Sequence, residues 1–512
     1  MFHTQAFSTF LLALLLFCPS ASAKDISLEQ LMMLHDLMPN EALKIDIQLP
    51  SSSKLESRSP ATTFSLQTIK QPIRVLIDVR STHSDGSHDF KTLIDLAKKR
   101  HIQSLAFTEH DRYTIRFGID PIPHVFGYSQ EHPSLYQTGL EQFFSDLNAV
   151  QQQDIILFAG TESTPGYSWQ GIPFKNLSLH NAERHFITLG AKKPSQIQNL
   201  SSYNLKHGYG NKELSLIFWF TSIFVLIFVL LRRRKRSIAL LVAGSFIAFM
   251  TTWLMKPIVD PDQDFIRTAH QENLFVIWTH PGTLSGVREG PMGVQLNTPP
   301  YNALVFESPT ADGFAAIYGD TDSNTIPGGL WDQFMMGYMA GYHPKPIWAV
   351  AAGDYHEEGQ SGEFLGNFPM DVWAESAQVD DILKALKQGR MASWQMGKER
   401  NLSLQALSLA YINPETGERS LLFTGDEAVV PANIELIAAI HELGDTSSNL
   451  TLQGQWVVDG RVASHVTLST KHNGTIQSTP LQLSKGRHVI RLQIPAQQGV
   501  RMETNPFLVQ VR

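Results

Sequence analysis

Seven short apolar runs, each beside a residue that can bind a metal or transfer a proton, constrain the fold of this chain most. The runs are residues 75–77 before Asp78, 104–108 before His110, 155–159 before Glu162, 186–189 after His185, 275–279 before His280, 303–306 before Glu307, and 347–352 before Asp354 and His356. Continuous apolar runs bounded by loops are typical of strands buried on both faces of a parallel sheet. The carboxyl ends of parallel strands meet at one rim of a barrel, where barrel enzymes place their chemistry. Since His, Asp and Glu bind zinc, manganese and iron, the series predicts an α/β barrel with a metal site at its rim.

The N-terminus has the pattern of a secretory signal. Eight apolar residues, 10–17, lead to Ala21-Ser22-Ala23, so we expect a signal peptide over residues 1–23. An uncleaved anchor is the alternative, although eight apolar residues are too few to span a bilayer. Cleavage would remove Cys18, the only cysteine of the chain, and with it any disulfide or thiolate ligand.

A second membrane signal lies in the middle of the chain. Residues 214–231 and 237–255 carry no charge, and the sequence RRRKR separates them. Each segment is long enough to cross a bilayer as a helix, and the basic loop is expected in the cytoplasm. A hairpin buried in a soluble core is the alternative. The predicted transmembrane hairpin, 214–255, would place both flanking parts outside the cytoplasmic membrane, on the periplasmic side, as a cleaved signal also would.

The composition and hydrophobic pattern of the sequence indicate further domain boundaries. Residues 24–71 are predicted to form a short helix and a linker, and residues 72–400 the barrel, with helices at 90–99, 137–151, 262–272 and 379–389. Alternating runs at 449–458, 463–470 and 488–494 predict an all-β sandwich over 401–512. The formal net charge of −7 argues against nucleic acid as a partner.

Short motifs within the barrel segment resemble a known family. In chain order they are DVRSTHSDG at 78–86, FTEHD at 107–111, GTE at 160–162, WTHPG at 278–282 and AGDYH at 352–356. This series resembles the PHP (polymerase and histidinol phosphatase) superfamily of metal-dependent phosphoesterases. The resemblance implies a distorted seven-stranded (βα) barrel that binds up to three divalent ions. Membrane-associated members of the family also carry a C-terminal β-rich domain.

The resemblance also implies which residues bind metal. One ion would use Asp85, His110 and His356, and a second would use Glu162, His185 and His280. His180 is an alternative to His185. A third ion would use two histidines of the first motif with Glu162 and Asp354, and without that ion Asp354 would be free to orient the attacking water.

The third subsite departs from the family pattern at its first motif. The family has two histidines where this chain has Asp78 and Arg80. Asp78 can still offer a carboxylate oxygen, but the guanidinium of Arg80 cannot ligate a metal. We therefore expect two divalent ions (Zn, Mn or Fe). Arg80 would either replace the charge of the third ion or bind a substrate phosphate. Glu109 or Asp111 is expected to hold the second ring nitrogen of His110.

These features predict a membrane-tethered, extracytoplasmic hydrolase that acts on a phosphate ester, either a small molecule or a lipid headgroup. Hydrolysis of a carbamate, ester or amide bond is the second hypothesis, because related two-metal barrels support such reactions. A catalytically degenerate binding protein of the cell envelope is the third. This third hypothesis follows from Asp78 and Arg80, which stand where the family has two metal-binding histidines.

Overall fold

The computed structural model describes residues 71–118, 127–151, 154–171, 175–203, 260–307, 310–318, 324–359, 363–444, 449–471 and 476–512. The predicted signal peptide, almost all of the predicted N-terminal helix and linker, and the predicted hairpin at 214–255 lie outside these ranges. No helix within them is long and apolar enough to span a bilayer.

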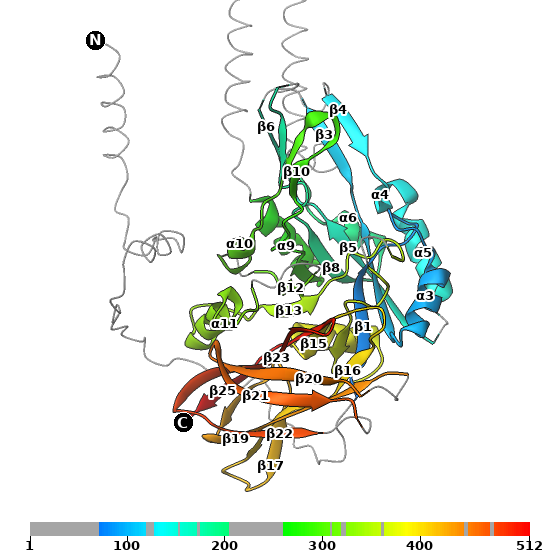
Figure 1. Cartoon of the computed structure of the whole chain (residues 1–512). Helices are drawn as coiled ribbons and strands as arrows, with labels where there is room; N and C mark the ends of the chain where they lie inside the picture. Colours follow the sequence, from blue (N-terminus) through cyan, green and yellow to red (C-terminus); the bar gives the residue numbers. More distant parts are fainter. Residues whose placement is uncertain are drawn as a thin grey trace, which may run out of the picture. The chain divides into compact units, whose positions relative to one another are not determined.

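Seven strands of one large sheet follow each other in chain order (Figure 1). They are β1 (Ile73–Val79), β2 (Ser104–His110), β5 (Ile156–Ser163), β8 (Phe186–Ala191), β9 (Phe275–Trp278), β12 (Gly313–Ile317) and β13 (Trp348–Ala351). A parallel bridge joins Val79, at the end of β1, to Tyr355, just beyond β13. The two outer strands of the series thus meet at one point, while a fully closed barrel stays a prediction.

One strand runs against the predicted direction. β8 pairs antiparallel with both β5 and β9, whereas β1, β2 and β5 are mutually parallel, as are β9, β12 and β13. The all-parallel prediction is therefore wrong at β8. The reversal has a consequence for the site, because His185 precedes β8. In a parallel strand it would lie at the far edge of the sheet, and here it joins the rim that carries Glu162 and His280.

The predicted sixth strand is also wrong. Residues 303–306 lie in helix α10 (Asn302–Glu307), and the sixth strand is β12. A run of four apolar residues does not distinguish a buried strand from a buried helical turn. Glu307 therefore ends a helix and not a barrel strand.

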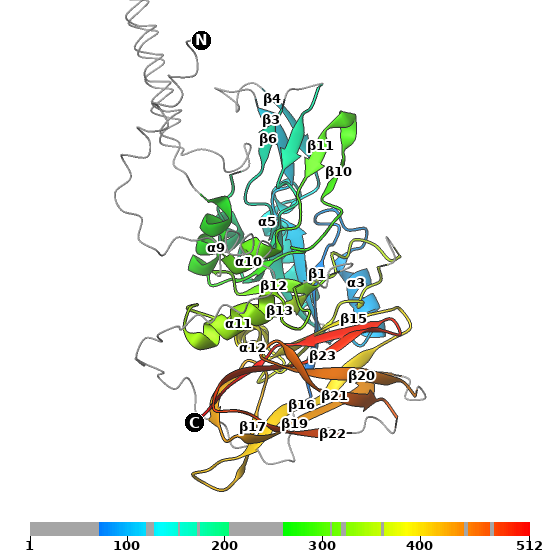
Figure 2. The ribbon, with the colours of Figure 1, turned by 60° about the vertical axis from the view of Figure 1, so that its left-hand side comes forward.

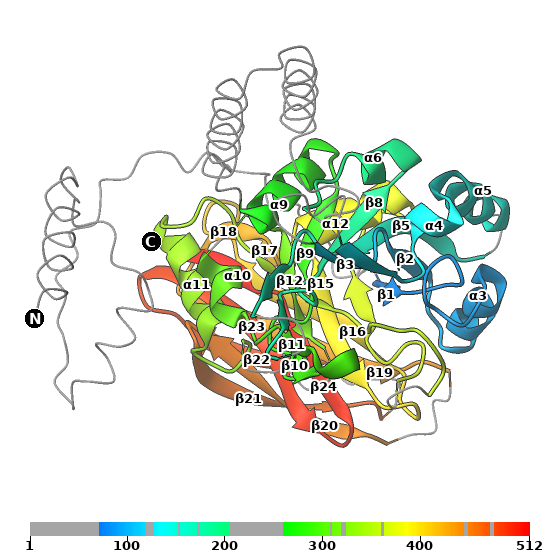
Figure 3. The ribbon, with the colours of Figure 1, turned by 90° about the horizontal axis from the view of Figure 1, so that it is seen from above.

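Helices lie outside the strands, as the view from above shows (Figure 3). They are α3 (Phe90–Lys99), α4 (Leu135–Thr138), α5 (Leu140–Val150), α6 (Pro194–Gln198), α9 (Pro261–Gln271), α10, α11 (Leu330–Ala340) and α12 (Val379–Lys387). Local sequence sets their starts. Asp89 accepts a hydrogen bond from the Thr92 N–H, and Asp260 caps α9 ahead of Pro261. Their apolar faces join the buried strand residues in one core.

Two small sheets project from the loops that follow the strands (Figure 2). One pairs β3 (Thr114–Gly118) with β4 (Gly127–Glu131). The other has the order β10 (Val287–Glu289), β11 (Gln295–Asn297), β7 (Ser178–His180) and β6 (Ser168–Gln170), and the short 3-10 helix η1 (Pro291–Gly293) joins β10 to β11.

The C-terminal part contains two sheets with a core between them. The large sheet continues from β1 through β14 (Met370–Val372), β15 (Met391–Met396), β24 (Val500–Thr504), β23 (Gly486–Gln497), β20 (Thr451–Val458) and β21 (Arg461–Ser469), with β25 (Phe507–Val511) and β18 (Glu427–Val430) on a branch. The second sheet has the order β17 (Arg419–Leu422), β16 (Leu402–Ile412), β19 (Asn433–Glu442) and β22 (Gln477–Gln482). Leu404 and Leu436 of the second sheet share a buried cluster with Trp456 and Leu492 of the first. The domain boundary near residue 400 stays a prediction, because the large sheet runs through it.

Candidate metal centre

The structure gathers the predicted ligands into three groups at one rim of the sheet. Within each group the candidate ligand atoms lie within 4.8 Å of one another. The groups are Asp85, His110 and His356; Glu162, His185 and His280; and Asp78, Glu162 and Asp354. Their members come from loops and strands far apart in the sequence, so the fold itself creates the cluster.

The first group joins the loop after β1 to the ends of β2 and β13. Nε2 of His110 and Nε2 of His356 each lie 3.4 Å from Oδ2 of Asp85. Burial opposes ionisation of Asp85, but hydrogen bonds from both histidines outweigh it and hold the pKa of Asp85 well below its usual range. Gly86 keeps this loop tight, because a Cβ there would lie 2.4 Å from the carbonyl oxygen of Arg80.

The second group is almost completely buried. Oε1 of Glu162 lies 3.1 Å from Nδ1 of His185 and 3.6 Å from Nε2 of His280. Oε1 of Glu162 and Nδ1 of His185 form an ion pair, while Nε2 of His185 and Nδ1 of His280 have no hydrogen-bond partner within the described ranges. Buried polar atoms without partners are rare in folded proteins. Imidazole nitrogens and a carboxylate in this arrangement suit a divalent metal ion.

A guanidinium fills the third group. Arg80 donates through Nη1 to Oδ1 of Asp78 at 3.0 Å, and its Nη2 donates to Oε2 of Glu162 and lies 3.4 Å from Oδ1 of Asp354. The Arg80 side chain is 0% exposed. Burial opposes its charge, but Glu162 and Asp78 outweigh that effect and raise the pKa of Arg80. The predicted role of Arg80 as a ligand of substrate phosphate does not fit this burial, whereas the role of a replacement charge does.

Strained backbone conformations hold several of these residues. Asp78, His280 and Asp354 have φ angles of 67°, 37° and 48°, a region that L-residues seldom adopt. Oδ2 of Asp78 accepts a hydrogen bond of 2.8 Å from the Asp354 N–H, so the first and last motifs hold each other in place.

The predicted supports of His110 are not the observed ones. Glu109 accepts hydrogen bonds from the N–H and hydroxyl of Ser81 and from the hydroxyl of Ser84. Asp111 accepts from the Arg112 N–H. Glu109 therefore fixes the loop that carries Asp85, and Tyr113 packs against the His110 ring with centroids 4.5 Å apart.

His180 lies outside all three groups. Its Nε2 is 2.9 Å from the Ser178 hydroxyl, and its Nδ1 is 3.2 Å from the side-chain nitrogen of Asn297. Both contacts belong to the small sheet that contains β7 and β11. Of the two predicted candidates, the structure brings His185 to the cluster.

Comparisons with known proteins found distant likenesses. No family model and no curated protein sequence matches the chain. A two-domain protein from Bacteroides vulgatus with a predicted PHP-like metal-dependent phosphoesterase is 13% identical, with a TM-score of 0.35 over 89% of this chain and 100% of its own. A protein from Bifidobacterium adolescentis, described as a candidate metal-dependent phosphoesterase, is 13% identical with a TM-score of 0.30 over 62% and 98%. An amidohydrolase from Chromobacterium violaceum is 13% identical with a TM-score of 0.25 over 56% and 88%. The first two descriptions name metal-dependent phosphoesterases.

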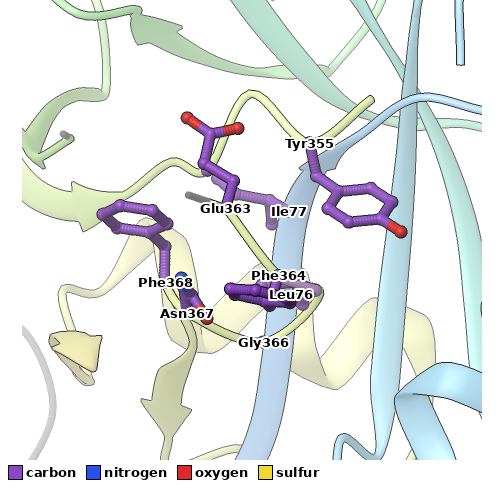
Figure 4. A pocket seen from close by; sticks show the side chains of 9 residues that line it. Leu76, Ile77, Tyr355, Glu363, Phe364, Gly366, Asn367 and Phe368 are labelled. Atoms are coloured by element: carbon purple, nitrogen blue, oxygen red, sulfur yellow. The ribbon is translucent and has the colours of Figure 1, made fainter. Parts of the chain in front are cut away.

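Two residues near the cluster were not predicted from the sequence motifs. The Tyr318 hydroxyl donates a hydrogen bond of 3.1 Å to Oδ2 of Asp354. Tyr318 directly follows the apolar run of β12, and this position at a strand end could have marked it in the sequence. Glu363 lines a small pocket with Ile77, Tyr355 and Phe368 (Figure 4). Burial and the nearby charges of Asp354 and Asp78 raise the pKa of Glu363 to about 7. No local pattern marks Glu363.

Proposed function

We propose that this chain is a PHP-type hydrolase that uses two divalent ions, one at Asp85, His110 and His356 and the other at Glu162, His185 and His280. The observation that carries the proposal is the second group, where two imidazole rings and a carboxylate are buried together and, in the described part of the chain, Nε2 of His185 and Nδ1 of His280 have no hydrogen-bond partner. Such atoms cost free energy unless an ion satisfies them. This argues against a degenerate site.

The ions would supply a Lewis acid and a water of lowered pKa. The side chain of Asp354 is 28% exposed, which makes it the most open carboxylate of the three groups. Arg80 and Tyr318 hold its two oxygens. This carboxylate can accept a proton from a water or orient that water toward a substrate.

A phosphate ester is the proposed substrate, on the resemblance of the motifs. Hydrolysis of a carbamate, ester or amide is the second candidate. The burial of Arg80 favours it, because that cation is not available to recognise phosphate.

We further propose that a hairpin at 214–255 tethers the enzyme to the cytoplasmic membrane, with the site on the periplasmic side. The geometry of the flanking residues supports a hairpin. A Cβ on Gly166 would lie 3.1 Å from Cβ of Pro261 and 3.5 Å from Cβ of Tyr203. The chain therefore leaves and re-enters the described part at one place, which is compatible with a hairpin between these two points.

A hydrolase screen tests this function. The full chain, purified in detergent with Mn²⁺ or Zn²⁺, is assayed on phosphomonoesters, phosphodiesters, carboxylic esters and amides. We expect turnover that is lost with a chelator and on His280→Ala, and retained in His180→Ala, a histidine outside the three groups. Turnover of esters or amides alone would select the second candidate. Metal-free protein without turnover on any substrate would contradict both.

A further inference from the structure

The third ligand group has a resident cation of its own. Nη1 of Arg80 also donates to the carbonyl and hydroxyl oxygens of Thr108, at 2.6 and 2.8 Å. The guanidinium also forms ion pairs with Asp78, Glu162 and Asp354, which are all three carboxylates of the group. These contacts hold a planar cation where three carboxylates converge.

The carboxylate oxygens that a third ion would need are already engaged. Oδ1 of Asp78 accepts a hydrogen bond from Arg80, and its Oδ2 accepts one from the Asp354 N–H. Asp354 lies with Oδ1 toward Arg80 and accepts from Tyr318 at Oδ2. A dication placed among them would also face a buried, permanently charged guanidinium, and charge repulsion is strong where water is excluded.

The contact between Arg80 and Glu162 also affects the second ligand group. Its Oε2 accepts from Arg80, and its Oε1 faces His185 and His280. The guanidinium thereby fixes the rotation of this carboxylate, so that one oxygen stays directed at the second group. Arg80 is a positioning residue in this arrangement, because its buried guanidinium acts through Glu162.

We propose that Arg80 is a built-in cation that occupies the third ion subsite permanently, so that the native chain binds two exchangeable ions and cannot bind a third. Asp78 and Arg80 form one structural unit, since Asp78 accepts a hydrogen bond from the guanidinium and another from the Asp354 N–H, which links the first motif to the last. The inference rests on the proposed function, because it assumes that the other two groups bind metal.

The number of bound ions tests the proposal. The full chain in detergent is stripped with a chelator, titrated with Mn²⁺ and analysed for bound metal after removal of excess ion. We expect two equivalents for the native chain and for Arg80→Lys, which keeps the charge. We expect three for Arg80→Ala, which opens the space among the carboxylates, and three for the double variant D78H/R80H.

The outcomes separate this inference from the function itself. Three equivalents on the native chain would overturn the proposal without any variant, so a variant that fails to fold does not rescue it. Two equivalents on the native chain and on both opened variants would overturn it too, while leaving the two-ion hydrolase intact. No bound metal on the native chain would overturn the proposed function and this inference with it.

Discussion

Nδ1 of His356 lies 2.7 Å from the backbone carbonyl oxygen of Asp354, which leaves Nε2 of the same ring facing Asp85. Burial opposes protonation of this ring. Hydrogen bonding to Asp85 and the charge of Asp354 outweigh it, and they raise the pKa of His356 to about 9 in the metal-free protein. The imidazole therefore carries a proton at neutral pH that a metal ion must displace.

Metal binding at the first group should consequently strengthen with pH. We expect the affinity to rise about tenfold per pH unit between about pH 6.5 and 9 and then to level off, because only the neutral ring binds. Each chain should release about one proton from His356 below pH 9. Calorimetry in buffers of different ionisation enthalpy measures the total proton release, and His356→Gln should lower it by about one proton per chain. An affinity independent of pH would contradict the assignment.

The same shift affects the stability of the metal-free protein. A raised folded-state pKa favours the folded state below the unfolded pKa of about 6.5, and this contribution disappears as pH rises toward 9. Thermal unfolding of the chelator-treated chain should thus show a midpoint that falls over this range. His356→Gln should flatten the curve, and an unchanged slope would be the opposing result.

Glu109 should matter for metal binding although it is not a ligand. Its replacement by Ala leaves the buried Ser81 N–H and two hydroxyls without an acceptor, which we expect to cost about 2–4 kcal/mol of stability. The loop that carries Asp85 would loosen, so metal should be lost from the first group before the second. Thermal melting and metal analysis measure both effects. The exposed Glu141→Ala is the matched control and should change neither.

Tyr318 should affect turnover without affecting metal content. Tyr318→Phe removes the hydroxyl that donates to Asp354 and keeps the ring, which packs against His280 with centroids 5.1 Å apart. We expect kcat to fall about tenfold, equivalent to about 1.4 kcal/mol for one lost hydrogen bond to a charged group. Full activity in this variant would show that Asp354 needs no such support.

Cysteine labelling tests the predicted membrane topology. A mature chain without Cys18 would contain no cysteine, so single introduced cysteines report without background. Met292→Cys, at a position 89% exposed on the small projecting sheet, should react with an impermeant maleimide once the outer membrane is opened. Arg234→Cys in the basic loop should react only after the inner membrane is lysed. The reverse pattern would place the site in the cytoplasm.

The sequence predicts which residues the fold gathers at the rim, because each lies in a short motif beside an apolar run. Asp85 and His356 belong to loops whose positions follow from the strands before them. The direction of β8 was harder to predict, although the order of residues held a clue. His185 precedes its run while the other ligands follow theirs, and an antiparallel strand is what brings it to the common rim.

Other features depend on contacts between distant residues and leave no local pattern. The runs at 303–306 and 313–317 have similar lengths, and tertiary packing makes the first a helix and the second a strand. Glu109 turns to Ser81 and Ser84 because the preceding loop folds back over it. Whether Arg80 faced a substrate or the interior was likewise decided by Glu162 and Thr108, which follow it by 82 and 28 positions.

The two-ion centre fixes the number of metal ions on the native chain. Elemental analysis of full-length protein, purified in detergent without added chelator, should find two divalent ions per chain. His110→Ala and His280→Ala should each reduce the count to one, because they belong to different groups, and His180→Ala should leave it at two. A native chain that binds no metal would contradict the two-ion centre. So would two ions retained by both His110→Ala and His280→Ala.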